Sequence, residues 1–184
     1  VVVLSGGPVY MSHLYPQQPV SRESLLENWR NYVRAAVQQF GDKVDYWQVG
    51  STLNDLETWG RVVFPAASKP ETEPDIELYA EMLEIAYSVI KSKAGGDTVI
   101  LADLAMGGDC AYHPLFYLQN LDELNAWYAF DTVSLSLPIL DEAPESAVVD
   151  QCGFVPVQSS GSSLADPVRA VHDFLEEAGA KKLW

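Results

Sequence analysis

Cysteine is scarce in this sequence, which contains only Cys110 and Cys152 among its 184 residues. Two cysteines are too few for a scaffold built from disulfides, and these two lack the Cys-x-x-Cys spacing of zinc and redox sites. The acidic run at 141–145 lacks the alternating ligand spacing of a calcium-binding motif. No GxGxxG or GxxxxGK loop, which would cradle a nucleotide phosphate, is present either. The sequence therefore predicts no metal and no cofactor.

Basic residues are also few, with 11 lysines and arginines against 26 acidic residues and a formal charge of −15. This charge repels phosphate backbones and anionic lipid, so it argues against nucleic-acid or membrane-surface binding. Neutral and cationic partners stay open. No apolar run approaches the length that spans a bilayer, and no basic-then-apolar secretory segment opens the sequence.

The sequence does contain regular secondary-structure signals. Apolar residues make up 48% of the chain, which is enough to bury the core of a single domain over 1–184. Helices are expected from a Ser21 cap to Gly41, from Thr72 or Asp75 to Gly95, within 114–127, and from Asp166 to Gly179. Between and around them, short apolar runs predict five strands at 1–4, 44–50, 98–102, 130–137 and 182–184.

The regular alternation of strands and one-faced helices predicts an α/β fold with a parallel sheet covered by helices. The long segments follow strands and the short turns follow helices. In a barrel, the loops that follow the strands form the face that carries the active site. We expect the five strands to be parallel neighbours in chain order. A doubly wound open sheet fits the alternation as well, although its usual phosphate-binding loops are absent.

One segment resembles a known family. The end of a helix at 32–44 and the run WQVGSTLN at 47–54 are similar to the approach to the fourth barrel strand of the clan A glycoside hydrolases, which reads W-E-x-x-N-E-P-N. Later framework residues agree in order through 184. The resemblance implies a partial (β/α)8 TIM barrel containing strands three to seven. The sequence starts without Met and ends at Trp184 in a strand-like run, so we expect both ends to lie inside a larger barrel.

The residues that would catalyse hydrolysis differ from the family pattern. A retaining glycosidase needs two carboxyl groups about 5 to 5.5 Å apart. By the resemblance, the acid/base glutamate falls at Thr52 and its preceding asparagine at Ser51. The nucleophilic glutamate would lie beyond Trp184, and the family's S-x-H-P-Y is SLSLP at 134–138. A threonine hydroxyl has no pKa suited to general acid catalysis. No catalytic residue is therefore assigned.

The first hypothesis is a non-catalytic barrel domain that acts as a scaffold, a protein-binding element or a weak carbohydrate-binding element. Its rival is an active glycoside hydrolase that uses Glu57 and a carboxylate located beyond Trp184. A third possibility, an open-sheet binding module, requires a strand order that is incompatible with barrel closure. We expect the first, in which the domain is not an enzyme.

Candidate binding residues cluster after the second predicted strand, where a sugar could be hydrogen-bonded and stacked on an indole. A histidine after the first strand is a further candidate. The alternative, which we favour because fold does not imply function, is that these residues close an ordinary polar loop. His113 and His172 are expected to be structural or solvent-facing. The candidates are Asn54, Asp55, Glu57, Trp59 and His13.

The two cysteines fall in loops that follow adjacent predicted strands. If the barrel register holds, these loops lie side by side, and the cysteines can approach the Cα separation of about 4.4 to 6.8 Å that a disulfide needs. A bridge between Cys110 and Cys152 would indicate an extracellular or cell-surface protein. The alternative is a small buried hydrophobe at Cys110 and a loop residue at Cys152. Both interpretations stay open.

Overall fold

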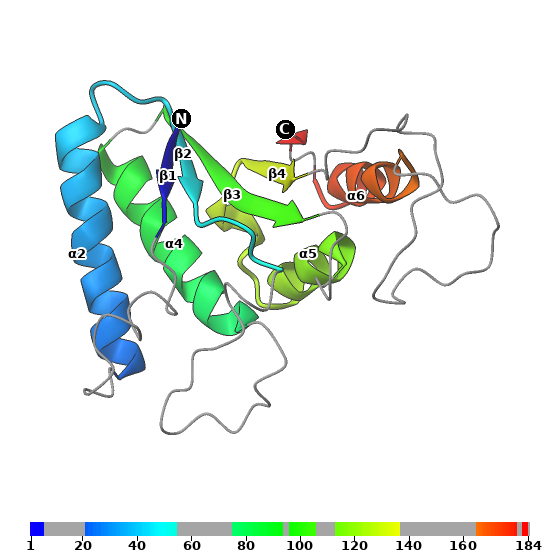
Figure 1. Ribbon diagram of the computed structural model, residues 1–184, viewed down its shortest axis with the longest axis horizontal. Helices are drawn as coiled ribbons and strands as arrows, with labels where there is room; N and C mark the ends of the chain where they lie inside the picture. Colours follow the sequence, from blue (N-terminus) through cyan, green and yellow to red (C-terminus); the bar gives the residue numbers. More distant parts are fainter. Residues whose placement is uncertain are drawn as a thin grey trace.

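The computed structural model describes residues 1–5, 21–54, 75–93, 96–105, 113–136, 165–179 and 182–183. Within these ranges the chain is an α/β protein in which strands and helices alternate (Figure 1). The elements are β1 (Val2–Leu4), α2 (Arg22–Phe40), β2 (Tyr46–Val49), α4 (Ile76–Lys93), β3 (Thr98–Ala105), α5 (Pro114–Glu123), the 3-10 helix η1 (Trp127–Ala129), β4 (Thr132–Ser136), α6 (Ala165–Glu177) and β5 (Lys182–Leu183).

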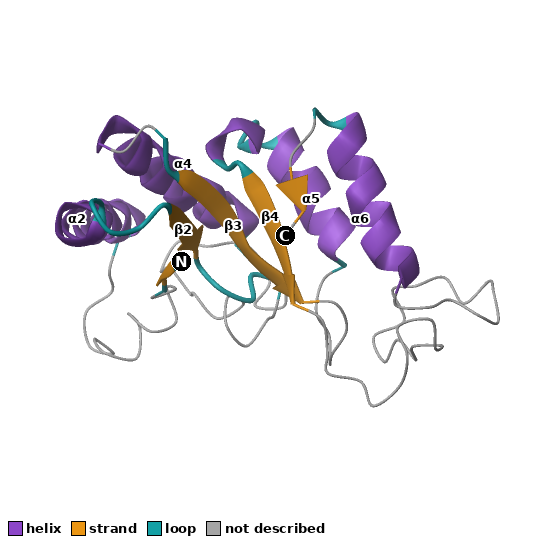
Figure 2. Cartoon of the chain, turned by 90° about the horizontal axis from the view of Figure 1, so that it is seen from above, coloured by secondary structure: helices purple, strands orange, loops and turns teal. Residues whose placement is uncertain are grey.

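The five strands form one sheet in the order β1-β2-β3-β4-β5, and every neighbouring pair is parallel. The predicted strand order is confirmed. Because crossovers between parallel strands are right-handed, an unbroken sequential order carries every connecting helix to the same face of the sheet. Figure 2 shows α2, α4, α5 and α6 on that one side. A doubly wound sheet would reverse its strand order at a switch point, so that alternative is wrong.

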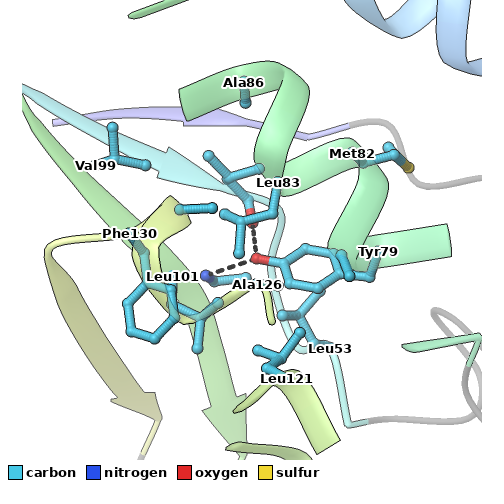
Figure 3. Close-up of a cluster of buried hydrophobic side chains, with 14 of the residues drawn as sticks. Leu53, Tyr79, Met82, Leu83, Ala86, Val99, Leu101, Leu121, Ala126 and Phe130 are labelled. Atoms are coloured by element: carbon cyan, nitrogen blue, oxygen red, sulfur yellow. Dashed lines mark hydrogen bonds between the residues drawn. The ribbon is translucent and has the colours of Figure 1, made fainter. Parts of the chain in front are cut away.

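The hydrophobic core lies between the sheet and these helices. Trp47 and Val49 of β2 are buried, whereas Tyr46, the first residue of the strand, is 44% exposed. Alternate side chains of β2 therefore face the helices. From the other side, Tyr79 and Leu83 of α4 are fully buried. Figure 3 shows this contact layer, in which α4 side chains pack against residues of β3 and against Phe130.

The helices begin where side chains supply hydrogen-bond acceptors for free backbone amides. The Ser21 hydroxyl accepts from the Ser24 amide at 3.2 Å, as its sequence position predicts. Asp75 Oδ1 accepts from the Leu78 amide at 2.9 Å and begins α4. His113 Nδ1 accepts from the Leu115 amide at 3.2 Å, which confirms a structural role for this histidine. The start predicted for the last helix is one residue late, because α6 already includes Ala165.

Strand β3 contains a β-bulge and is longer than predicted. It extends to Ala105, whereas the apolar run alone placed its end at residue 102. Leu101 pairs with Val133 and Leu104 pairs with Leu135, so three steps along β3 match two steps along β4. One extra residue is therefore accommodated between Leu101 and Leu104. As a result Leu104 packs in the helix-side core, and the side chain of the preceding Asp103 lies on the opposite face of the sheet.

Candidate functional site

Polar side chains gather at the carboxyl ends of β2 and β3, on the face of the sheet away from the helices. Ligands of parallel α/β sheets bind at the carboxyl ends of the strands. Gln48 lies between two core-facing residues of β2, so its amide points to the opposite face. Gln48 Nε2 donates to Asp103 Oδ1 at 3.1 Å and to the Gly50 carbonyl oxygen at 3.1 Å. These bonds join the ends of two adjacent strands through their side chains.

The turn after β2 folds back toward Asp103 through an unusual backbone conformation. Gly50 has φ +88° and Thr52 has φ +48°, in the left-handed region that β-branched residues rarely occupy. The Thr52 amide donates to Asp103 Oδ1 at 3.1 Å, and its hydroxyl lies 3.5 Å from Asp103 Oδ2. The Leu53 amide donates to the Asp103 carbonyl oxygen at 3.3 Å. Asp103 therefore holds the strained Thr52 in place, and such strain is often retained at functional sites.

The half-buried Asp103 carboxylate has acceptor capacity left for a ligand. An ionised carboxylate offers about four acceptor positions. Oδ1 already accepts two bonds of 3.1 Å, whereas Oδ2 receives a single long contact of 3.5 Å from the Thr52 hydroxyl among the described residues. The described part of the chain also contains no group of His, Cys, Asp and Glu that could hold a metal ion. Chemically, this arrangement can accept hydrogen bonds from a neutral or cationic donor.

Asn54 lies at the end of the same turn, but its side chain is fully buried and directed to β3. Its Nδ2 donates to the Ala105 carbonyl oxygen at 2.8 Å, and its Oδ1 accepts from the Ala105 amide at 2.7 Å. The Asn54 side chain thus pairs with both backbone polar groups of Ala105, as a residue of a neighbouring strand would. Both polar atoms of the Asn54 side chain therefore bond to the backbone of β3. Contact of Asn54 with a sugar stays a prediction.

Replacing Asn54 with alanine should lower the free energy of unfolding by about 1–3 kcal/mol, because both polar groups of Ala105 lose their partner. Urea unfolding followed by circular dichroism measures this. The control is Asn120→Ala, which removes one exposed hydrogen bond to the Phe116 carbonyl oxygen on α5. It should cost less than about 0.5 kcal/mol. Equal losses in the two variants would contradict the proposed role of Asn54.

The remaining predicted site residues are Asp55, Glu57, Trp59 and His13, and all four lie outside the described residues, as do Cys110 and Cys152. His172 is exposed on α6 beside Asp173 and Glu176, in agreement with its predicted solvent-facing position. Sequence reasoning missed Asp103 and Gln48. The available signal was the single acidic residue in the otherwise apolar run TVILADLA, since an isolated charge in a buried strand usually has a specific partner.

Tyr79 supports this site from the helix side. Its hydroxyl donates to the Val49 carbonyl oxygen at 2.8 Å and accepts from the Ala102 amide at 3.3 Å, as the dashed lines in Figure 3 show. Burial raises the pKa of Tyr79 above its ordinary value, so the phenol stays protonated and can donate. The end of β2 and the bulged part of β3 are therefore joined on both faces of the sheet.

Comparison with known proteins supports the fold class and nothing finer. No family model matches the sequence, and no curated protein matches it. Among solved structures, the chain is similar to the hyperthermophilic β-glucosidase of Pyrococcus furiosus, with a TM-score of 0.50 and 11% sequence identity. The match covers 98% of this chain and 48% of that one, so this chain spans about half the length of the β-glucosidase. At this identity the likeness concerns the fold alone.

The described helices are α2, α4, α5, α6 and the short η1. None of them combines the length and the apolar character that a bilayer-spanning helix needs. This finding agrees with the expectation that the segment does not insert into a membrane.

Proposed function

We propose that this chain is a segment of a (β/α) barrel related to the clan A glycoside hydrolases, corresponding to strands three to seven, and that it binds carbohydrate without cleaving it. Three observations support the proposal. The strands follow in sequential order with the helices on one face, the fold is similar to that of a β-glucosidase, and the run at 47–54 resembles the fourth strand of the family.

The non-catalytic part of the proposal rests on the residue at position 52, which is a threonine. The resemblance puts the acid/base residue at this position, and here the side chain is a hydroxyl directed to Asp103. A hydroxyl cannot protonate a glycosidic oxygen at neutral pH. The surrounding amide, hydroxyl and carboxylate can still hydrogen-bond a sugar, and the formal charge of −15 suits a neutral ligand. A scaffold or protein-binding role belongs to the same proposal if no sugar binds.

We expect no hydrolysis of p-nitrophenyl β-D-glucoside by the purified protein, because Thr52 replaces the acid/base carboxylate. The release of nitrophenol, followed by absorbance, measures this. Calorimetric titration with cellotetraose should instead detect weak binding, near the millimolar affinity that about −4 kcal/mol represents. Turnover that persists through repeated purification would contradict the non-catalytic proposal. Absence of binding to cellotetraose and to other neutral glycans would remove the carbohydrate part.

A second candidate, an active glycoside hydrolase, is favoured by one contact. Asp103 places a carboxylate oxygen 3.5 Å from the Thr52 hydroxyl, beside the position that the resemblance assigns to the acid/base group. Hydrolysis would need a further carboxylate, for which Glu57 or a residue after Trp184 is the predicted source. Turnover that is abolished by Asp103→Asn or by Glu57→Gln would favour this candidate over the first.

The proposed location is extracellular or at the cell surface. It rests on the predicted bridge between Cys110 and Cys152, since disulfides persist in oxidising compartments.

A further inference from the structure

We infer that Asp103 and Gln48 together form the part of the site that recognises sugar hydroxyls, and that the site selects neutral over anionic saccharides. The inference rests on the proposed carbohydrate binding and deepens it. It assigns a role to two residues on adjacent strands, β3 and β2, to which the family resemblance gives no function.

The first step concerns which face Asp103 occupies. In a regular strand, side chains alternate strictly between the two faces. Val99 and Leu101 belong to the helix-side core, so an unbroken β3 would also direct residue 103 into that core. The extra residue between Leu101 and Leu104 reverses the alternation and brings Asp103 beside Gln48. The bulge therefore moves a carboxylate from an apolar environment to the ligand-binding edge of the sheet.

The second step concerns which atoms remain for a ligand. The donor group of Gln48 is already used, because Nε2 bonds both Asp103 Oδ1 and the Gly50 carbonyl oxygen. No described residue donates to Gln48 Oε1, and Asp103 Oδ2 receives one long contact from Thr52. The pair thus presents two acceptor oxygens on neighbouring strands. Only a ligand that supplies hydrogen-bond donors can pair with both, and the hydroxyl groups of a sugar do so.

The third step concerns charge. The ligand would meet the negative charge of Asp103 in a protein whose formal charge is −15. A carboxylate or sulfate on the sugar would be repelled and would supply no donor. A neutral saccharide avoids this cost, and hydrogen bonds from its hydroxyls to an ionised carboxylate are stronger than bonds between neutral groups. The site therefore favours neutral glycans such as cello-oligosaccharides over uronic-acid oligomers.

The fourth step concerns rigidity. Asp103 Oδ1 is held by Gln48 and by the Thr52 amide, each at 3.1 Å. The carboxylate is consequently oriented before the ligand arrives. Less conformational entropy is lost on binding when the binding group is already fixed. This allows a small number of hydrogen bonds to give measurable affinity.

The test compares two aspartates that lie at opposite ends of β3. Asp103→Asn keeps the size of the side chain but replaces one acceptor oxygen by a donor and removes the charge. The matched control is Asp97→Asn, because Asp97 also accepts a hydrogen bond from β2, through Trp47 Nε1 at 2.8 Å, but precedes the amino end of the strand. Calorimetric titrations use cellotetraose and tetragalacturonate as probes, and thermal unfolding checks that both variants are folded.

The wild-type protein should bind cellotetraose and show no detectable binding of tetragalacturonate. Asp103→Asn should weaken cellotetraose binding by about tenfold or more, the effect expected for losing a hydrogen bond to a charged group. Asp97→Asn should stay within about twofold of the wild type. Cellotetraose binding that survives Asp103→Asn, or tighter binding of tetragalacturonate, would overturn the inference and leave the proposed function standing.

A second measurement applies even if Asp103→Asn does not fold. In a ¹⁵N–¹H spectrum of the wild-type protein, addition of cellotetraose should shift the amide signals of Thr52 and Asp103, since the Thr52 amide donates to the carboxylate that binds the sugar. Shifts confined to other residues would overturn the assignment of the site. No shift and no heat with any neutral glycan would overturn both the inference and the proposed carbohydrate binding.

Discussion

Trp47→Ala should lower the free energy of unfolding by about 3–5 kcal/mol, the usual cost of removing a large aromatic side chain from a core. Trp47 is fully buried on β2, and its indole Nε1 donates to Asp97 Oδ2 at 2.8 Å. The alanine variant would leave a cavity between the sheet and the helices. It would also leave the carboxylate of Asp97, a buried residue, without this donor. Urea unfolding monitored by circular dichroism gives the difference.

The control for this variant is Tyr128→Ala. Tyr128 is also aromatic, but it is 58% exposed, so its removal creates no cavity. Its loss should change the free energy of unfolding by no more than about 1 kcal/mol. If Trp47→Ala cost as little as Tyr128→Ala, the packing of β2 against the helices described above would be wrong.

Tyr79→Phe should lower the free energy of unfolding by about 2–4 kcal/mol, because the Val49 carbonyl and the Ala102 amide both lose their bond to its hydroxyl. Tyr117→Phe is the matched control. Tyr117 is also fully buried, and its hydroxyl has no hydrogen-bond partner among the described residues. Removing that hydroxyl should be nearly neutral or slightly stabilising. Similar losses in the two variants would contradict the bridging role of Tyr79.

The same tyrosine predicts how stability depends on pH. Burial raises the pKa of Tyr79 above the value near 10 that a phenol has in the unfolded chain. The unfolded state therefore loses the proton first as the pH rises. The stabilising contribution of this group is fully present below about pH 10 and is lost progressively above it. Above pH 10, Tyr79→Phe should decline in stability less steeply than the wild type.

The proposed binding site depends on the same elements that these variants test. Tyr79 joins β2 to β3 on the helix side, and the Gln48–Asp103 hydrogen bond joins them on the opposite side. A variant that loosens β2 from β3 at their carboxyl ends, such as Tyr79→Phe, should therefore also weaken sugar binding. For this reason Asp97→Asn, which disturbs β2 and β3 away from the site, is the relevant control for Asp103→Asn.

The sequence by itself determined the alternation of elements, their approximate bounds and the order of the strands. These features follow from local rules. Ser21 caps α2 because its hydroxyl lies three residues before a free amide, and periodic apolar residues define the buried face of each helix. Strand order was predictable because right-handed crossovers leave few arrangements for sequential parallel strands.

Only the tertiary structure decided which polar residues meet. The site depends on a bulge that adds one residue to β3 between Leu101 and Leu104, and on the left-handed conformation of Thr52. The apolar run ends at residue 102, so the sequence pattern alone placed the end of β3 too early. A shift of one residue exchanges the two faces of a strand, so without knowledge of the bulge Asp103 could not be assigned to a face. Asn54 was found from its sequence position, but its buried pairing with Ala105 depends on the backbone of a strand 51 residues away. Contacts between residues so distant in the chain are set by packing, which no local pattern encodes.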